Sequence, residues 1–168
     1  MKEKLLNRLI KYVQIYTPSN EESSSSPSTE FQFDLANELK SEMDSIGISG
    51  ACVDENCYVY GYIPASEGCK DYPSIGLIAH MDTVRPHEGY TRDPYDAGED
   101  PLTVFGLGSN DDGGSVVSMI AAFSHFHGQA LPFNLMLLLS REEECSGEDG
   151  SSYLFREGGY FSGEGAYR

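Results

Sequence analysis

The sequence predicts an α/β fold in which a mixed β-sheet is flanked by helices on both faces. Two segments before residue 47 repeat apolar residues at helical spacing. Two later apolar runs, 75–79 and 133–139, have the length of buried strands. Between them lies the segment 116–126, which is apolar on nearly every side. This order of elements is typical of a sheet covered by helices.

Length and composition restrict the class of protein. The 168 residues suffice for one domain with a sizeable core. The 11 basic and 27 acidic residues give a net charge of −16, which excludes nucleic acid and anionic membranes as partners and suits cations. No segment approaches the roughly 20 apolar residues of a membrane span. Without a signal-peptide core, the protein is expected to be cytoplasmic.

The first part of the chain is expected to be helical. Lys2–Tyr16 carries an amphipathic pattern that Thr17-Pro18-Ser19 ends. Residues 20–28 contain five serines and one proline, which predicts a mobile loop. A second helix is expected to begin near Ser28, with Ser28 or Thr29 as its cap, and to end at Gly47.

Strands and a further helix are expected in the rest of the chain. Val53–Tyr62 alternates about a Glu-Asn turn and predicts a hairpin. Ile75–Ala79 is expected to be a strand buried on both faces, and a long loop follows it over 85–101. Leu102–Phe105 predicts a short strand that leads into the glycine-rich stretch 106–114. The four cysteines lack C-x-x-C spacing and are expected to be reduced thiols, although two of them, Cys52 and Cys57, could pair across the hairpin.

Three polar clusters stand at or just after the expected ends of strands. They are His80/Asp82, Asp111/Asp112 and Glu142/Glu143/Glu144. Sites in such sheets lie beyond the carboxyl ends of the strands, so we expect the clusters to meet in space. Taken singly, each cluster is also typical of something simpler: a polar strand end, a helix cap or a solvated loop. Their occurrence together favours a site.

One imidazole and several carboxylates would form an oxygen-rich site with a single nitrogen donor. That donor set suits zinc and can also hold manganese or cobalt. An aspartate such as Asp111 has two oxygens and can contact two ions at the separation of about 3.5–4 Å that two-metal hydrolysis requires. Of two neighbouring acids, one can bind metal while the other accepts a proton from water. A phosphate-binding loop is disfavoured because Asp111 and Asp112 would repel an anion.

The motifs resemble one known family. His-Met-Asp-Thr-Val at 80–84, Gly-Ser-Asn-Asp-Asp-Gly-Gly at 108–114 and Ser-Arg-Glu-Glu-Glu at 140–144 are similar to those of the zinc peptidases and deacylases that include tripeptidase T, carboxypeptidase G and acetylornithine deacetylase. Residues 17–84 are most similar to the tripeptidase branch, whereas the chain from 89–94 onward, including 142–147, is more similar to the acetylornithine deacetylases. The resemblance implies a zinc-exopeptidase-like fold and metal-dependent hydrolysis of small peptides or, alternatively, of N-acyl amino acids.

The resemblance also implies a role for each site residue. His80 would bind one zinc ion, Asp82 would orient its ring, Asp111 would bridge two zinc ions next to a cis peptide to Asp112, Glu143 would act as general base and then general acid, and Glu144 would bind the second zinc. Cobalt or manganese could replace zinc in this site.

The chain departs from the family pattern in several places. Gly113 stands where relatives usually carry lysine, and no histidine follows Glu144. The acids that follow Glu144 do not have the spacing of a further metal ligand; they are Glu148, Asp149, Glu157 and Glu164. The histidines other than His80 lie outside the motifs; they are His87, His125 and His127. We expect the inserted lid domain of relatives to be absent. We therefore expect 1–168 to be a single, partial catalytic domain with a glycine-rich tail at 158–168; a catalytically incomplete metal-binding module is the alternative.

Overall fold

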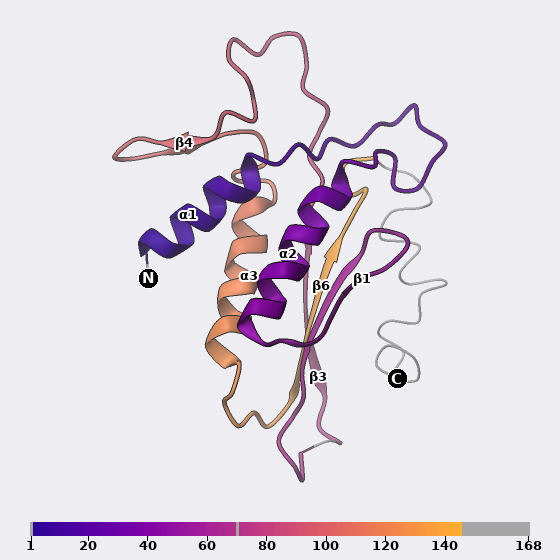
Figure 1. Cartoon of the computed structure of the whole chain (residues 1–168), viewed down its shortest axis with the longest axis vertical. Helices are drawn as coiled ribbons and strands as arrows, with labels where there is room; N and C mark the ends of the chain where they lie inside the picture. Colours follow the sequence, from indigo (N-terminus) through magenta and orange to yellow (C-terminus); the bar gives the residue numbers. More distant parts are fainter. Residues whose placement is uncertain (1, 70, 146–168) are drawn as a thin grey trace.

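The structure is a computed structural model that describes residues 2–69 and 71–145 (Figure 1). The expected tail at 158–168 and the four late acids, Glu148, Asp149, Glu157 and Glu164, lie outside these residues. The elements are α1 (Lys2–Val13), α2 (Gln32–Ile46), β1 (Ser49–Val53), β2 (Val59–Ile63), β3 (Ser74–His80), β4 (Gly98–Glu99), β5 (Val104–Phe105), α3 (Gly113–Phe126) and β6 (Asn134–Ser140). Over the described ranges, none of the helices combines the length and apolar character of a membrane span.

Four strands form a mixed sheet in the order β1-β2-β6-β3. Strand β2 pairs antiparallel with both β1 and β6, whereas β3 and β6 are parallel. Their register places Ser74 opposite Asn134 and His80 opposite Ser140. Parallel neighbours need a long crossover connection, which α3 supplies here. The predicted α/β class and mixed sheet are thus confirmed.

The three helices gather on one side of the sheet (Figure 1). Alternate residues of β6, Leu135, Leu137 and Leu139, point into the same hydrophobic cluster as the buried faces of all three helices. The opposite face of the sheet carries no helix among the described residues, and Tyr58, Tyr60 and Leu138 form a small separate cluster. Helices were predicted on both faces of the sheet, and among the described residues they cover one face.

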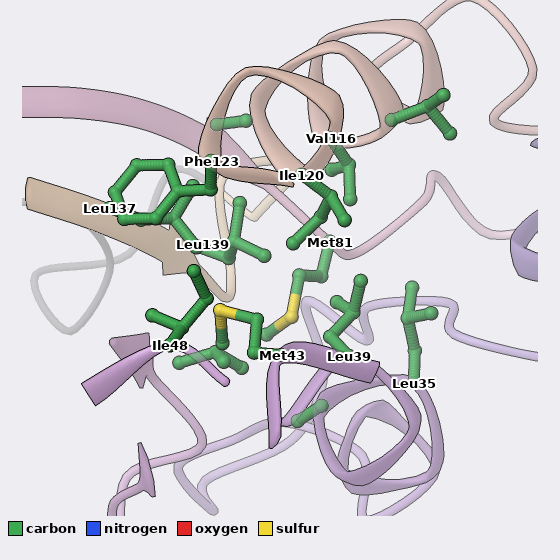
Figure 2. Packing of buried hydrophobic residues seen from close by; sticks show 14 of the residues in the cluster. Leu35, Leu39, Met43, Ile48, Met81, Val116, Ile120, Phe123, Leu137 and Leu139 are labelled. Carbon is green, nitrogen blue, oxygen red and sulfur yellow. The ribbon is translucent and has the colours of Figure 1, made fainter. Parts of the chain in front are cut away.

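The main cluster fixes α2 and α3 against β6. Figure 2 shows Leu39 and Met43 of α2 facing Ile120 and Phe123 of α3, with Leu139 of β6 beside them. Ile120, Phe123, Leu39, Met43 and Leu139 are all 0% exposed. Full burial of such a side chain contributes about 1.5–3 kcal/mol. This packing sets where the N-terminus of α3 lies relative to the ends of the strands.

The second helix begins later than the sequence indicates. Phe31 occupies the N-cap position of α2 and makes no side-chain capping hydrogen bond. Neither Ser28 nor Thr29 caps it, because both hydroxyls have other acceptors: Thr29 Oγ1 donates to the carbonyl of Pro18 at 2.7 Å, and Ser28 Oγ to Glu142 at 2.7 Å. The predicted end is confirmed, since Gly47 adopts a left-handed φ of 88° there.

Strand β3 is not buried on both faces as predicted. It ends the strand order and has β6 as its one partner in the sheet. Ile75 and Ile78 are 44% and 46% exposed, whereas Ala79 and His80 at its carboxyl end are buried. A continuous apolar run fits a central strand and an edge strand equally, so the sequence pattern could not distinguish them.

Other predicted elements are present with shifted limits. The hairpin is formed by β1 and β2, and Asp54 Oδ1 accepts hydrogen bonds from the backbone N–H groups of Asn56 and Tyr58 in its turn. The first helix ends at Val13 rather than Tyr16. The strand expected before the glycine-rich stretch is β5, which pairs with β4. All four cysteines are free thiols.

Candidate metal centre

The parallel pairing of β3 and β6 brings two of the polar clusters together. The strands end side by side, with His80 opposite Ser140, and the N–H of Met81 donates to the carbonyl of Ser140 at 2.8 Å. The segments 80–82 and 142–144 therefore leave the sheet at the same edge. The turn before α3 lies next to them, because the His80 N–H is 3.4 Å from Asp112 Oδ2. The expected meeting of the three clusters is observed.

His80 is held through one ring nitrogen and exposes the other to acids. Its side chain is buried, with Nδ1 3.1 Å from the carbonyl oxygen of Asp82 and 3.4 Å from Asp82 Oδ1. A carbonyl only accepts, so Nδ1 carries a proton. Nε2 lies 3.0 Å from Asp111 Oδ1 and 3.9 Å from Glu143 Oε2. A histidine fixed at one nitrogen and open at the other is the usual arrangement of a metal ligand.

The protonation of His80 follows from these contacts. Burial alone would lower its pKa, but the hydrogen bond and charge of Asp82, together with Asp111 and Asp112, raise the pKa to about 9. Both ring nitrogens face acceptors, which favours the imidazolium form in the absence of metal. A cation that binds Nε2 would replace this proton and take over its contact with the carboxylates.

Asp82 connects the two strand ends. It is 0% exposed. Its Oδ2 accepts hydrogen bonds from Ser19 Oγ at 2.6 Å and from the N–H of Glu144 at 3.1 Å, and its Oδ1 accepts the N–H of Glu143 at 3.1 Å. Burial would raise the pKa of Asp82, but hydrogen bonds from His80, Ser19 and these N–H groups lower it overall. One ionised carboxylate thus orients the His80 ring and fixes the backbone of both glutamates.

Asp111 approaches the site from a tight glycine-rich turn. Its peptide bond to Asp112 is cis, as the resemblance implies, and its side chain is 74% exposed. Gly108 adopts a φ of +82°, and its carbonyl accepts the N–H of Gly113 at 2.9 Å. A Cβ at Gly113 would lie 2.5 Å from that carbonyl oxygen. This close approach leaves no room for a side chain at Gly113 in the present conformation of the turn.

The residues that could hold a metal fit the donor set expected for zinc. One ligand atom each from His80, Glu143 and Glu144 lies within 4.8 Å of the others, and no other such group of three occurs in the ranges that the structure describes. Asp111 adjoins this group through His80. Burial and then the charge of Asp111 raise the pKa of Glu144, which His80 opposes. A cation would relieve this repulsion between carboxylates.

Four residues of the site region were assigned no role in the site by the sequence. Ser19, Ser28 and Gln32 are buried polar residues that contact Asp82 or Glu142, and Glu142 itself is 7% exposed. Gln32 offered one signal: it precedes Leu35 and Leu39 on the buried stripe of α2. A polar side chain at a core position needs a buried partner.

A cavity of about 380 Å³ adjoins the candidate ligands. Asp111 and Glu144 lie in its wall, together with Tyr90 and Arg92 from the long loop after β3. The Arg92 guanidinium stacks on the ring of Phe105, with 4.4 Å between Cζ and the ring centroid. The volume lies within the range of small-molecule sites in proteins.

Comparisons with known sequences agree with the motifs. The profile described as "Peptidase family M20/M25/M40" matches residues 76–166. Peptidase T of Bacillus pumilus is 46% identical over 89 residues, which are 53% of this chain and 22% of that protein. Peptidase T of Listeria monocytogenes is 45% identical over 94 residues, 56% of this chain and 23% of the relative. The match thus spans less than a quarter of the length of these relatives.

Solved structures show the same fold. Human carnosine dipeptidase 1 superposes with a TM-score of 0.75 at 20% identity and covers 96% of this chain and 36% of its own. Aminopeptidase PepT from Bacillus cereus gives a TM-score of 0.57 at 18% identity, covering 86% of this chain and 37% of its own. At these identities the likeness concerns the fold alone, and it extends over about a third of each larger protein.

Proposed function

We propose that this chain, which belongs to peptidase family M20/M25/M40, forms the metal-binding part of a hydrolase that cleaves small peptides in the manner of a tripeptidase or aminopeptidase. The observation that carries the proposal is the geometry of His80. Its Nδ1 is fixed by Asp82, while Nε2 faces Asp111 and Glu143 beside Glu144. This arrangement combines a pre-oriented nitrogen ligand with the carboxylates that a divalent cation needs.

The residues divide into ligands and groups that act on the ligands or on water. His80, Asp111 and Glu144 would hold zinc, with cobalt or manganese as substitutes and two ions as the full complement. Asp82 keeps the proton of His80 on Nδ1 and so keeps Nε2 free for the metal. Bound zinc would supply polarisation of the scissile carbonyl and a lowered pKa of water.

Glu143 is the candidate general base and, later, general acid. Its side chain is 56% exposed, so it reaches solvent water, and its Oε2 lies 3.9 Å from His80 Nε2. Its backbone N–H is held by Asp82 at 3.1 Å. A carboxylate with a fixed backbone and a free head can accept a proton from water and return it to a leaving amine.

The cavity and the sequence relatives support the proposed substrate class. The space of about 380 Å³ beside Asp111 and Glu144 accommodates a ligand of a few residues. The sequence relatives named Peptidase T favour a short peptide. An N-acyl amino acid, as in an acetylornithine deacetylase-like enzyme, is the alternative that the segment 89–94 favours.

Metal analysis and hydrolysis on the purified chain test the proposal. We expect zinc to bind, to raise the melting temperature, and to support release of an amino acid from a tripeptide. Glu143→Ala should abolish turnover while the metal stays bound. Equal activity of this variant and the wild type would remove Glu143 from the role of base, and an N-acetyl amino acid assayed in parallel separates the two substrate classes.

A second candidate is a metal-binding module without catalysis. It is favoured by the ligand set, since the group of three candidate ligands in the described residues contains a single histidine. It predicts fewer than one tightly bound ion per chain and no amide hydrolysis. Two ions per chain with metal-dependent turnover would eliminate it.

The remaining expectations belong to the same proposal. The chain is proposed to be one partial catalytic domain over 1–168 that acts in the cytoplasm. Four free thiols agree with a reducing compartment. Mobility of the loop 20–28 stays a prediction, although Ser28 at its end is anchored to Glu142.

A further inference from the structure

Glu142, the first acid of the run at 142–144, has no place in the proposed chemistry, yet it is the one of the three that is buried. It is 7% exposed. Its Oε1 accepts three hydrogen bonds: from the Ser28 N–H at 2.9 Å, from Ser28 Oγ at 2.7 Å and from Gln32 Nε2 at 2.7 Å. A carboxylate oxygen that accepts three buried donors makes a strong, directional anchor.

The backbone at Glu142 adopts a conformation that side chains other than glycine disfavour. Its φ is +60°. A non-glycine residue in the left-handed region is strained and persists there where its surroundings determine its conformation. The surroundings here are the three donors on Oε1. The side chain of Glu142 therefore holds the chain in a turn that the residue would otherwise avoid.

The consequence of this turn is seen at the next two residues. The N–H groups of Glu143 and Glu144 both face Asp82, one on each carboxylate oxygen at 3.1 Å. Residues 142–144 are thus fixed by two sets of contacts. Asp82 binds the backbone of Glu143 and Glu144, and Ser28 and Gln32 bind the side chain of Glu142. Neither set of contacts requires a metal.

We propose that Glu142 is a positioning residue, which anchors the strand end of β6 to Ser28 and Gln32 and so sets the placement of Glu143 and Glu144. The importance of that placement rests on the proposed function, because Glu143 is the candidate base and Glu144 a candidate ligand. The anchor itself rests on the contacts of Glu142. It also gives the buried Gln32 and Ser28 a part in the site, through an acceptor that belongs to neither the ligands nor the base.

A set of variants separates the side chain from the backbone turn. Glu142→Gly removes the acceptor but suits the left-handed φ, Glu142→Ala removes the acceptor and keeps the strain, and Glu142→Gln keeps an Oε1 acceptor of the same reach. Ser28→Ala removes one of the three donors and is a milder variant that preserves folding. Glu67→Ala, at an exposed glutamate that is distant from Glu142 in the sequence, is the matched control.

The first measurement uses the metal-free protein. Amide hydrogen exchange of Glu143 and Glu144, followed by NMR, reports directly on their contacts with Asp82. We expect exchange at least about tenfold faster in Glu142→Gly and Glu142→Ala, an intermediate change in Ser28→Ala, and wild-type rates in Glu142→Gln and Glu67→Ala. Wild-type rates in Glu142→Gly would overturn the proposal.

The second measurement uses zinc affinity and the visible spectrum of the Co²⁺ form. Loss of an outer-shell anchor weakens metal binding by about 10–100-fold, which we expect for Glu142→Gly, with an altered spectrum and rescue by Glu142→Gln. If affinity and spectrum stay unchanged while only the melting temperature falls, Glu142 is merely structural and the proposal fails. If wild type binds no metal, the proposed function fails, and the exchange rates alone decide the role of Glu142.

Discussion

The two sides of the candidate site are built differently. On the buried side, His80, Asp82 and Glu142 are 8%, 0% and 7% exposed, and each is hydrogen-bonded to its neighbours. On the open side, the side chains of Asp111, in the turn before α3, and Glu143, just after β6, are 74% and 56% exposed. The first side is organised before any ligand arrives, whereas the second side faces water and can move toward a cation.

This difference shows that the buried residues of the site stabilise the fold, whereas the exposed residues remain able to bind a cation. A buried carboxylate such as Asp82 stabilises the fold only while its donors are present, because donor and acceptor are both cut off from water. An exposed carboxylate such as Asp111 exchanges its partners with solvent at little cost. Mutations on the buried side should therefore mainly lower the free energy of unfolding, and mutations on the open side should mainly lower the affinity for metal.

The largest effect on stability is expected on the buried side, from Asp82→Ala. It would leave the Ser19 hydroxyl and the N–H groups of Glu143 and Glu144 without their acceptor, and it would remove the carboxylate that lies 3.4 Å from His80 Nδ1. We expect a loss of about 3–5 kcal/mol in the free energy of unfolding, measured with urea on the metal-free protein. Asp71→Ala at an exposed position is the control. A loss below about 1 kcal/mol would show that the buried side is not organised in this way.

The charge of the buried side gives the next largest effect, as a pH dependence. Folding raises the pKa of His80 from 6.5 to about 9. The folded state therefore binds this proton more tightly, so its contribution is complete below pH 6.5 and is lost as the pH rises through 9. We expect the metal-free protein to lose on the order of 2–3 kcal/mol over this range. His80→Gln should lack this part of the profile, and parallel profiles for the two proteins would contradict the assignment.

The turn that carries Asp111 gives a smaller effect, because backbone rather than side-chain contacts fix it. A Cβ at Gly113 would lie 2.5 Å from the carbonyl oxygen of Gly108, whereas one at Gly114 would meet nothing closer than Ser109 O at 3.8 Å. We expect Gly113→Ala to cost about 1–2 kcal/mol and Gly114→Ala to be neutral or stabilising. Thermal unfolding of the pair measures the difference. Equal melting temperatures would mean that the turn adapts freely.

The sequence predicted some features of the fold and the site and missed others. Motif residues such as His80 and Glu144 could be placed at one sheet edge, because the carboxyl ends of strands collect polar side chains. The exposure of Ile75 and Ile78 could not be predicted, since an apolar run does not reveal the number of neighbouring strands. The roles assigned to all the site residues, His80 and Glu144 included, stay predictions.

The supporting contacts were the harder part to predict. The anchor of Glu142 joins residues 28 and 32 to residue 142, and no local pattern signals a partner more than one hundred positions away. Ser28 resembled a helix cap, and its hydroxyl was instead taken by this distant carboxylate. The Ser28 hydroxyl forms a buried tertiary hydrogen bond instead of capping the helix, because the buried bond stabilises the fold more than a solvent-exposed cap does.

The smallest effect on stability is expected on the open side, from Asp111→Asn. The amide keeps the size of the side chain and an acceptor for His80 Nε2, and the exposed position limits the value of the lost charge to within about 0.5 kcal/mol in the metal-free protein. Zinc affinity should nevertheless fall about tenfold or more, because a charged ligand is replaced by a neutral one. Urea unfolding with chelator and zinc titration measure the two quantities on the same sample, with Asp93→Asn in the cavity wall as the control. A large loss of stability with unchanged zinc affinity would reverse the roles of the two sides, since Asp111 would then support the fold and the metal would have its ligands elsewhere.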